Sequence, residues 1–316
     1  MLAYGVAADV VDEYTRCSET SAYIALDKFC ESVLAVFAPT YMRKANQQDI
    51  NRLLAINAGR GFPGMLGSID CMHWEWKNCP MAWKGQYQGK SGKPSLVLEA
   101  VASHDTWIWH SFFGVSGKFN DLTVVARSPV FDDLLNGVAT EVDFEVNGHR
   151  YNMGYYLTDG IYPAWATFVK SIKNPVTHKD SKFAQKQEAV RKDVERAFGI
   201  LQARFAIVRN PALAKSIPLL SLIMNTCICL HNMIVEDERD TYLRAKTYEK
   251  YVKEFNKDTM LEVETDLFSG IRFRRRPSVV NSVEGYMQNR RDVHDAITHQ
   301  QLTKDLIEHI WRRRGD

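Results

Sequence analysis

The sequence predicts an α/β fold in which helices flank a mixed β-sheet. Three observations support this prediction: helical patterning fills the first 58 or so residues, four segments of strand character follow up to residue 158, and two strongly patterned helices come after them. Hydrophobic residues make up 45% and charged residues 25% of the 316 residues. This balance is that of a folded globular chain, and it excludes a wholly disordered, collagen-like or coiled-coil protein.

The N-terminal part contains two expected helices. In the first, Leu26, Cys30, Val33 and Phe37 recur at helical spacing, and Ser18 or Thr20 is placed to cap it. A second, short helix is expected over residues 49–58. The Gly-Phe-Pro-Gly run at 61–64 then predicts a turn that ends the helical region.

Strand character begins after this turn. Runs rich in aliphatic and aromatic residues predict strands over 65–76, 95–102 and 106–115. The Ser-His-Asp sequence at 103–105 predicts a hairpin between the second and third of them. A fourth strand is expected over 151–158.

The connections around the fourth strand are less strongly patterned. A helix is expected over 122–135, with Pro129 as a possible interruption. After the fourth strand we expect a short helix within 162–171 and a polar, basic loop over 173–183. Helices are then predicted over the three segments 184–205, 217–235 and 300–311.

Three strands, a helix, a fourth strand and further helices are the element order of the ribonuclease-H-like fold. The sheet of that fold begins as an antiparallel meander and continues with parallel strands. The predicted fold class is therefore α/β, a ribonuclease-H-like mixed sheet flanked by helices, with a helical N-terminal segment and a charged helical C-terminal tail. We divide the chain accordingly into residues 1–60, 61–240 and 241–316.

Charge is nearly balanced overall but uneven along the chain. The net charge is +2, yet residues 170–215 hold eleven Lys or Arg against four Asp or Glu. Arginines also cluster at 272–276 and 312–314. Local basic surface of this kind attracts polyanions, although ordinary solvated faces would give the same pattern. The first residues lack the features of a secretory signal, and the apolar run 217–235 contains a proline and polar residues, so we expect no membrane association.

Three acidic residues occupy unusual places. Asp70 lies inside an apolar strand, where an unpaired charge is costly to bury. Asp159 follows the fourth strand and precedes Gly160, which permits a sharp turn. Glu195 borders the apolar stripe of the strongest helix. If these elements are neighbours, the three carboxylates converge, and an all-oxygen set of this kind suits Mg²⁺ or Mn²⁺.

Five blocks of the sequence resemble the plant branch of the PIF/Harbinger transposases, described as plant transposon proteins with a DDE superfamily endonuclease domain. The first is Gly-Phe-Pro-Gly-Met-Leu-Gly-Ser-Ile-Asp-Cys-Met-His-Trp, which continues to Pro80. The remaining blocks follow in family order at 119–124, 156–163, 194–205 and 230–237. One such block would be weak support, whereas five in order are specific. Asp159 and Glu195 are separated by 35 residues, a spacing typical of DDE enzymes.

The resemblance implies a catalytic core in which Asp70, Asp159 and Glu195 hold divalent cations. Two such ions would support hydrolysis of DNA phosphodiesters and joining of 3′-OH ends to target DNA. It also implies a nuclear protein that forms a homo-oligomer on DNA and works with a Myb-like DNA-binding partner. Residues 1–60 would then be the remnant of a helix-turn-helix, and the arginines at 272–276 a nuclear import signal.

Further residues are candidates for DNA or metal contact. Asp121 belongs to the second block and could ligate a metal, although its local sequence favours a helix N-cap. Trp83 could stack on an unpaired base, or it could belong to the core. Five basic residues lead into the helix of Glu195 and are our candidates for phosphate contacts: Lys179, Lys182, Lys186, Arg191 and Lys192.

Two other functions stay open at this level. The chain could be a domesticated DNA- or chromatin-binding protein that has kept the transposase fold without catalysis. The acidic triad alone would also suit a ribonuclease. Glu195 itself has a structural alternative, because Arg191 lies one helical turn away and could pair with it.

Overall fold

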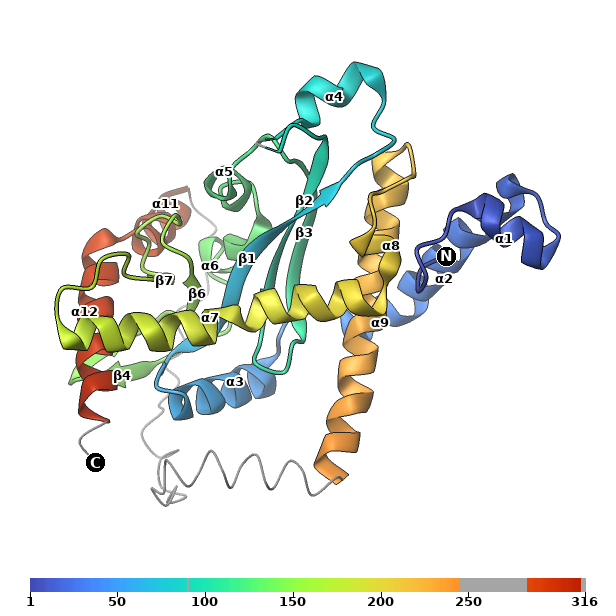
Figure 1. Cartoon of the computed structure of the whole chain (residues 1–316). Coiled ribbons are helices and arrows are strands. Elements are labelled where there is room, and N and C mark those ends of the chain that lie inside the picture. Colours follow the sequence, from blue (N-terminus) through green and yellow to red (C-terminus); the bar gives the residue numbers. More distant parts are fainter. Residues whose placement is uncertain (90, 245–282, 314–316) are drawn as a thin grey trace.

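The computed structural model describes residues 1–89, 91–244 and 283–313 (Figure 1). Its centre is a five-stranded sheet in the order β3-β2-β1-β6-β7. The strands are β1 (Met65–Glu75), β2 (Ser95–Ala102), β3 (Ile108–Ser116), β6 (Tyr155–Thr158) and β7 (Phe168–Lys170). The first three form an antiparallel meander, and β6 and β7 run parallel to β1. The predicted mixed α/β sheet flanked by helices is confirmed.

The remaining elements surround this sheet. The longer helices are α2 (Glu19–Tyr41), α3 (Gln47–Gly59), α7 (His178–Arg204), α9 (Ile217–Arg244), α11 (Val283–Val293) and α12 (Ala296–Arg312). The shorter elements are α1 (Ala8–Thr15), α4 (Met81–Tyr87), α5 (Asp121–Val125), η1 (Pro129–Phe131), α6 (Asp132–Leu135), β4 (Phe144–Val146), β5 (His149–Tyr151) and α8 (Ala206–Arg209). Ser18 caps α2 as predicted, because its hydroxyl accepts a hydrogen bond from the backbone N–H of Ser21.

The two faces of the sheet are covered by different helices. On one face α7 crosses the strands (Figure 1). Its Val194 and Phe198 join Met72 and Trp74 of β1 in the core. The other face packs against α5, η1 and α6, where Ile69 belongs to a separate apolar cluster. Since residues alternate along a strand, even-numbered residues of β1 face α7.

The segment from 122 to 183 departs most from prediction. The helix expected over 122–135 is broken into α5, η1 and α6, because Pro129 cannot donate a helical hydrogen bond. The strand expected over 151–158 is two elements, β5 and β6, and β5 pairs with β4 as a hairpin. The helix expected within 162–171 is wrong, since this segment contains strand β7.

Helix α7 also begins earlier than expected. Thr177 accepts a hydrogen bond from the N–H of Asp180, and the Asp180 carboxylate in turn accepts one from the N–H of Thr177. This reciprocal capping box starts the helix at His178, inside the stretch predicted as a loop.

Helix α9 is long and apolar enough to cross a membrane by length and composition. In the structure it packs against α2 and β3. Its Asn232 side chain bonds both the N–H and the C=O of Ile108, at 2.9 Å each, and donates to the carbonyl of Tyr41. Asn232 therefore satisfies backbone groups on the outer edge of the sheet, as a helix of a folded core does.

Helix α12 returns to the fold from the far end of the chain. Its Leu302, Leu306 and Ile310 share an apolar cluster with Phe183 and Val190 of α7. The described part of the 241–316 segment thus packs on the sheet domain through an apolar interface. The arginine cluster at 272–276 lies outside the described residues.

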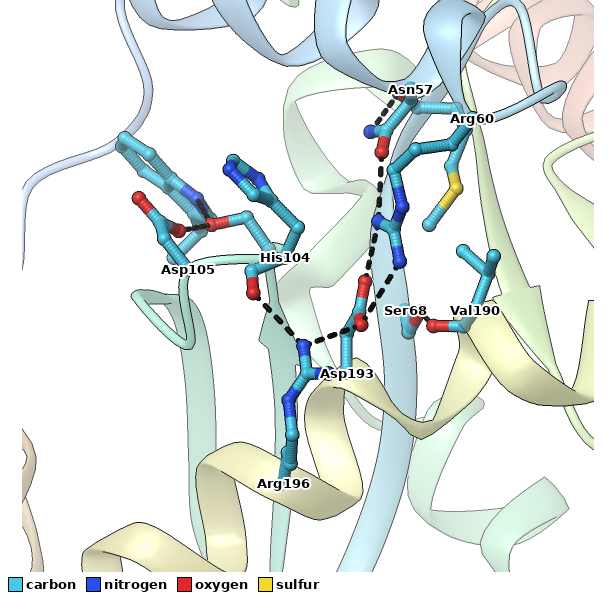
Figure 2. A network of polar contacts seen from close by, with 11 residues as sticks. Asn57, Arg60, Ser68, His104, Asp105, Val190, Asp193 and Arg196 are labelled. Carbon is cyan, nitrogen blue, oxygen red and sulfur yellow. Dashed lines mark hydrogen bonds and ion pairs between the residues drawn. The ribbon is translucent and has the colours of Figure 1, made fainter. Parts of the chain in front are cut away.

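A buried polar network fixes α7 against α3 and the β2–β3 turn (Figure 2). Asp193 of α7 is fully buried, and Arg60 donates two hydrogen bonds to its carboxylate, at 2.6 and 3.1 Å. Arg196 donates to the same carboxylate at 2.8 Å and to the carbonyl of His104 at 2.9 Å. Arg60 also donates to Asn57, whose amide donates to the backbone carbonyl of Met65 at the start of β1.

Removing Arg60 should destabilise the protein more than removing Arg196. The Arg60 side chain is 16% exposed and that of Arg196 is 55% exposed, so Arg60 carries most of the compensation for the buried Asp193 charge. We expect Arg60→Ala to lower the free energy of unfolding by about 3 kcal/mol and Arg196→Ala by less than about 1 kcal/mol. Urea unfolding of both variants tests this, and equal losses would contradict it.

Candidate catalytic site

The acidic site is built at the point where β1 and β6 run side by side. These strands are parallel, and Ser68 of β1 pairs with Leu157 of β6. Continuing that register by two residues brings Asp70 level with Asp159, on strands about 4.8 Å apart. Ser68 bonds α7 and Leu157 packs against it. Asp70 and Asp159 each come two residues later, so the alternation of side chains assigns both to the face covered by α7.

Helix α7 crosses β1 at Asp70. The hydroxyl of Ser68 donates to the carbonyl of Val190 at 3.3 Å, and Gln202 contacts the sulfur of Met72 at 3.3 Å. Asp70 lies between these two contacts on β1. The stretch of α7 that passes it therefore contains Glu195.

A buried glutamine holds the same helix to β6 and β7. Gln187 is fully buried, and its amide donates to the carbonyl of Thr158 at 2.8 Å and to that of Val169 at 3.1 Å. Thr158 is the residue before Asp159. The carboxylate oxygen of Asp159 accepts a hydrogen bond from the N–H of Ile161 at 2.9 Å, which closes the turn after β6.

The acids share one electrostatic environment. The pKa of Asp70 is raised to about 6, chiefly by burial and in smaller part by repulsion from the carboxylates of Asp159, Asp121 and Glu195. A hydrogen bond from the N–H of Cys71 to the Asp70 carboxylate opposes this rise. The structure thus brings the other three sequence-predicted acids within electrostatic range of Asp70.

Asp121 reaches this environment from α5, but it is not the helix cap. That expectation is wrong, because Asn120 is the N-cap and accepts hydrogen bonds from the N–H and the hydroxyl of Thr123. Asp121 is the next residue, in the first turn of α5. Its charge raises the pKa of Asp70, of Cys71 and of Tyr162. Helix α5 itself packs on the face of the sheet opposite α7, where its Val125 joins Ile69.

Glu195 forms an ion pair with Arg191. The distance from Nη1 of Arg191 to Oε1 of Glu195 is 2.7 Å, and the Glu195 side chain is 42% exposed. In the residues that the structure describes, no group of three His, Cys, Asp or Glu is gathered closely enough to hold a metal ion. The close convergence of Asp70, Asp159 and Glu195 expected from the sequence is therefore not observed, and Glu195 is paired with Arg191 instead. The three candidate ligands are all carboxylates, which is the donor type that hard divalent cations prefer.

Two lysines flank Asp159, and neither was singled out from the sequence. Lys170 pairs with Thr158 across β6 and β7, and its pKa is lowered by burial and by Lys173 but raised by Asp159. The Lys173 stem packs over Gly160, where a Cβ would lie 2.7 Å from the Lys173 Cε. The only sequence feature that indicated these two lysines is the basic composition of residues 170–215.

The predicted DNA contacts have separate surroundings. Lys179 pairs with Glu308 at 2.6 Å, and Arg191 pairs with Glu195. Lys192 is exposed on α7. Trp83 is 41% exposed on α4, and its ring lies 6.1 Å from that of Trp76, so one side of it packs on the core.

A comparison of the sequence with models of protein families identifies the family of the chain. The family described as plant transposon protein matches residues 39–242, which is more than half of the chain. The chain belongs to the plant transposon protein family. The match includes β1, β6 and α7, so the acidic site of this plant transposon protein lies inside the matched region. No curated protein and no solved structure matches the chain significantly.

Replacing Asp70 by Asn should stabilise the metal-free protein at neutral pH. Because the pKa of Asp70 is about 6 in the folded chain against an ordinary 3.8, the folded state binds the proton more tightly. Asp70 therefore costs stability progressively as the pH rises from about 4 through 6. At pH 7 we expect Asp70→Asn to raise the free energy of unfolding by about 1–3 kcal/mol.

The measurement is urea unfolding in chelator at pH values from 4 to 7. Wild type and variant should be nearly equal at pH 4 and diverge toward pH 7. Parallel curves across this range would show that the Asp70 charge is not repelled in the folded protein.

Proposed function

We propose that this plant transposon protein is a DDE endonuclease and transposase of the PIF/Harbinger type with a ribonuclease-H-like core. One observation carries the proposal: Asp70 lies on β1 and Asp159 directly follows the neighbouring parallel strand β6, and helix α7, which bears Glu195, crosses both strands. The family match supports it, because it covers all three residues. The reaction is hydrolysis of a phosphodiester at the end of an element, followed by joining of the free 3′-OH to target DNA.

The proposed cofactor is Mg²⁺ or Mn²⁺. Asp70, Asp159 and Glu195 would hold it, with Asp121 as a further ligand from α5. When bound, such ions activate a water molecule and stabilise the leaving oxygen of the phosphodiester. Neutralising the repulsion that raises the pKa of Asp70 is the electrostatic reason for binding a cation there.

The chain's own residues position the site and its substrate. Gln187 fixes α7 over the ends of β6 and β7, and the Arg60–Asp193 pair fixes the rotation of the same helix. Arg191 holds the Glu195 carboxylate in an ion pair, and a bound cation would compete with Arg191 for this carboxylate. Lys173 packs over Gly160, the residue after Asp159, and is suited to bind a phosphate of the strand that is cut.

The same proposal extends to partners and location. The protein would act in the nucleus as a homo-oligomer on DNA, with a Myb-like protein to recognise element ends. The five predicted basic contacts and Trp83 would add binding that depends little on sequence.

Asp159→Asn should weaken Mn²⁺ binding without unfolding the protein. The amide keeps the shape of the side chain but removes its negative charge. Its oxygen can still accept the hydrogen bond from the N–H of Ile161 that closes the turn. Calorimetric titration with Mn²⁺ measures the effect, for which we expect a loss of at least tenfold in affinity. Asp143→Asn, at an exposed ion pair with Arg150, is the matched control. Equal affinities in wild type and Asp159→Asn would assign Asp159 a structural role.

Glu195→Gln should abolish strand cleavage and leave DNA binding within about twofold of wild type. Glu195 is required for ligation, whereas phosphates are held by lysines and arginines. The assay supplies an element end, Mn²⁺ and the partner protein. Cleavage by Glu195→Gln at the wild-type rate would refute its catalytic role.

A second candidate is a non-catalytic DNA- or chromatin-binding protein that retains the transposase fold. The ion pair between Arg191 and Glu195 favours it, since this pair gives Glu195 a structural partner. Firm DNA binding without cleavage by wild type, under the complete conditions above, would select this candidate.

A further inference from the structure

A second group of cations lies where three helices meet, away from the acidic site. The C-terminus of α3, the first turns of α7 and the C-terminus of α12 come together there, and α12 lies beyond the family-matched region. The members of this cation cluster are Arg60, Lys182, Lys186, Arg312 and Arg313.

Backbone contacts hold Arg313 in this cluster. Its guanidinium donates to the carbonyl of Ala58 at 2.5 Å and to that of Gly59 at 3.3 Å, the last carbonyls of α3. A guanidinium has five N–H donors, so three remain for a ligand. Arg313 is thus oriented by backbone carbonyls, and no carboxylate among the described residues pairs with it.

Gly61 lies at the meeting point of the three helices. Its φ of +93° is in the region that favours glycine, and a Cβ there would contact Cγ1 of Ile310 at 3.6 Å and Cε of Lys186 at 3.9 Å, which are ordinary van der Waals distances. The aliphatic end of Lys186 and the last turn of α12 therefore both pass over this glycine. The cluster is a packed junction and not a set of unrelated surface side chains.

Most of its charge is uncompensated within the described residues. The pKa of Lys186 is lowered by burial and by the cations Arg313, Lys182 and Arg60. Arg60 is neutralised by Asp193, whereas the described ion pairs include none for Lys182, Lys186 or Arg313.

The positive charge of the cation cluster also affects His309 of α12. Burial and the charges of Arg313 and Arg312 lower its pKa, and its Nε2 is buried without a hydrogen-bond partner among the described residues. Mutual repulsion of this kind is relieved when an anion binds between the cations.

The cluster is distinct from the acidic site. Lys186 precedes Glu195 by nine residues, which is about 13 Å along α7 and half a turn around it. The cations therefore lie on the side of α7 turned toward α3, where Asp193 meets Arg60.

We propose that this cluster binds backbone phosphates of DNA at a second contact, outside the catalytic site, and that α12 completes it. The choice of DNA rests on the proposed function. Lys182 and Lys186 supply compact charges, and the guanidinium of Arg313 supplies directed hydrogen bonds to phosphate oxygens. A duplex held there and at the acidic site would have phosphate contacts on both sides of α7.

The test measures how the affinity of the full chain for a 30-base-pair DNA duplex depends on salt concentration. Fluorescence anisotropy reports the affinity at each salt concentration. Removing one cation that neutralises a phosphate should reduce the slope of log K against log salt by about one. We expect a reduction of about two for the double variant Lys182→Ala/Lys186→Ala and about one for Arg313→Ala. Arg313→Lys should recover part of the affinity.

The control is Lys77→Ala/Lys215→Ala, which removes the same charge from two exposed lysines elsewhere. An unchanged slope in the cluster variants, or an equal change in this control, would overturn the proposal. Circular dichroism checks folding, and Lys186→Gln replaces any alanine variant that unfolds.

Two further measurements separate this proposal from related ones. Calorimetry with inorganic phosphate alone identifies a small-anion site if the cluster variants lose phosphate binding but not DNA binding, and that result would overturn the DNA assignment. Cleavage is assayed independently. A wild type that cuts no DNA while the cluster variants lose DNA binding would defeat the proposed function and support the second contact.

Discussion

The placement of α7 across the sheet is the constraint on which the site depends. This helix contributes a metal-ligand candidate, but its position is set by polar groups that are themselves buried. Asp193 is held by two arginines from different elements, and Gln187 satisfies carbonyls at the ends of two strands. Such contacts have narrow geometric tolerance, because a small rotation of the helix would leave a buried charge or carbonyl without a partner.

The acidic site illustrates a conflict between folding and chemistry. Placing a carboxylate in the interior of β1 next to other acids raises its pKa, which is unfavourable for the isolated chain at neutral pH. Groups with strongly shifted pKa values concentrate at functional sites for this reason. The apolar packing of β1 and the α7 network offset this cost and keep the strand in place.

Much of the core was predictable because its signals are local. The strand 95–102 is a continuous apolar run between turn residues, and it is observed with those bounds. Strand β7 was missed since it has only three residues, and its strand conformation comes from pairing with β6. Asp70 stood out as an acid among apolar residues, whereas Asp193 did not. One charged residue among many on a helix looks solvent-exposed until the partner that buries it, Arg60, is known.

The junction at Gly61 has a consequence for biosynthesis. Arg313 bonds a carbonyl 255 residues earlier in the chain, and Ile310 closes the apolar cluster under α7. Contacts over such separations form slowly, because closing a long loop of chain has a large entropic cost before the contact contributes. During synthesis, the apolar cluster that α12 shares with α7 is therefore completed only once residue 310 has been made. Until then, Phe183 and Val190 lack part of their packing and are available to chaperones.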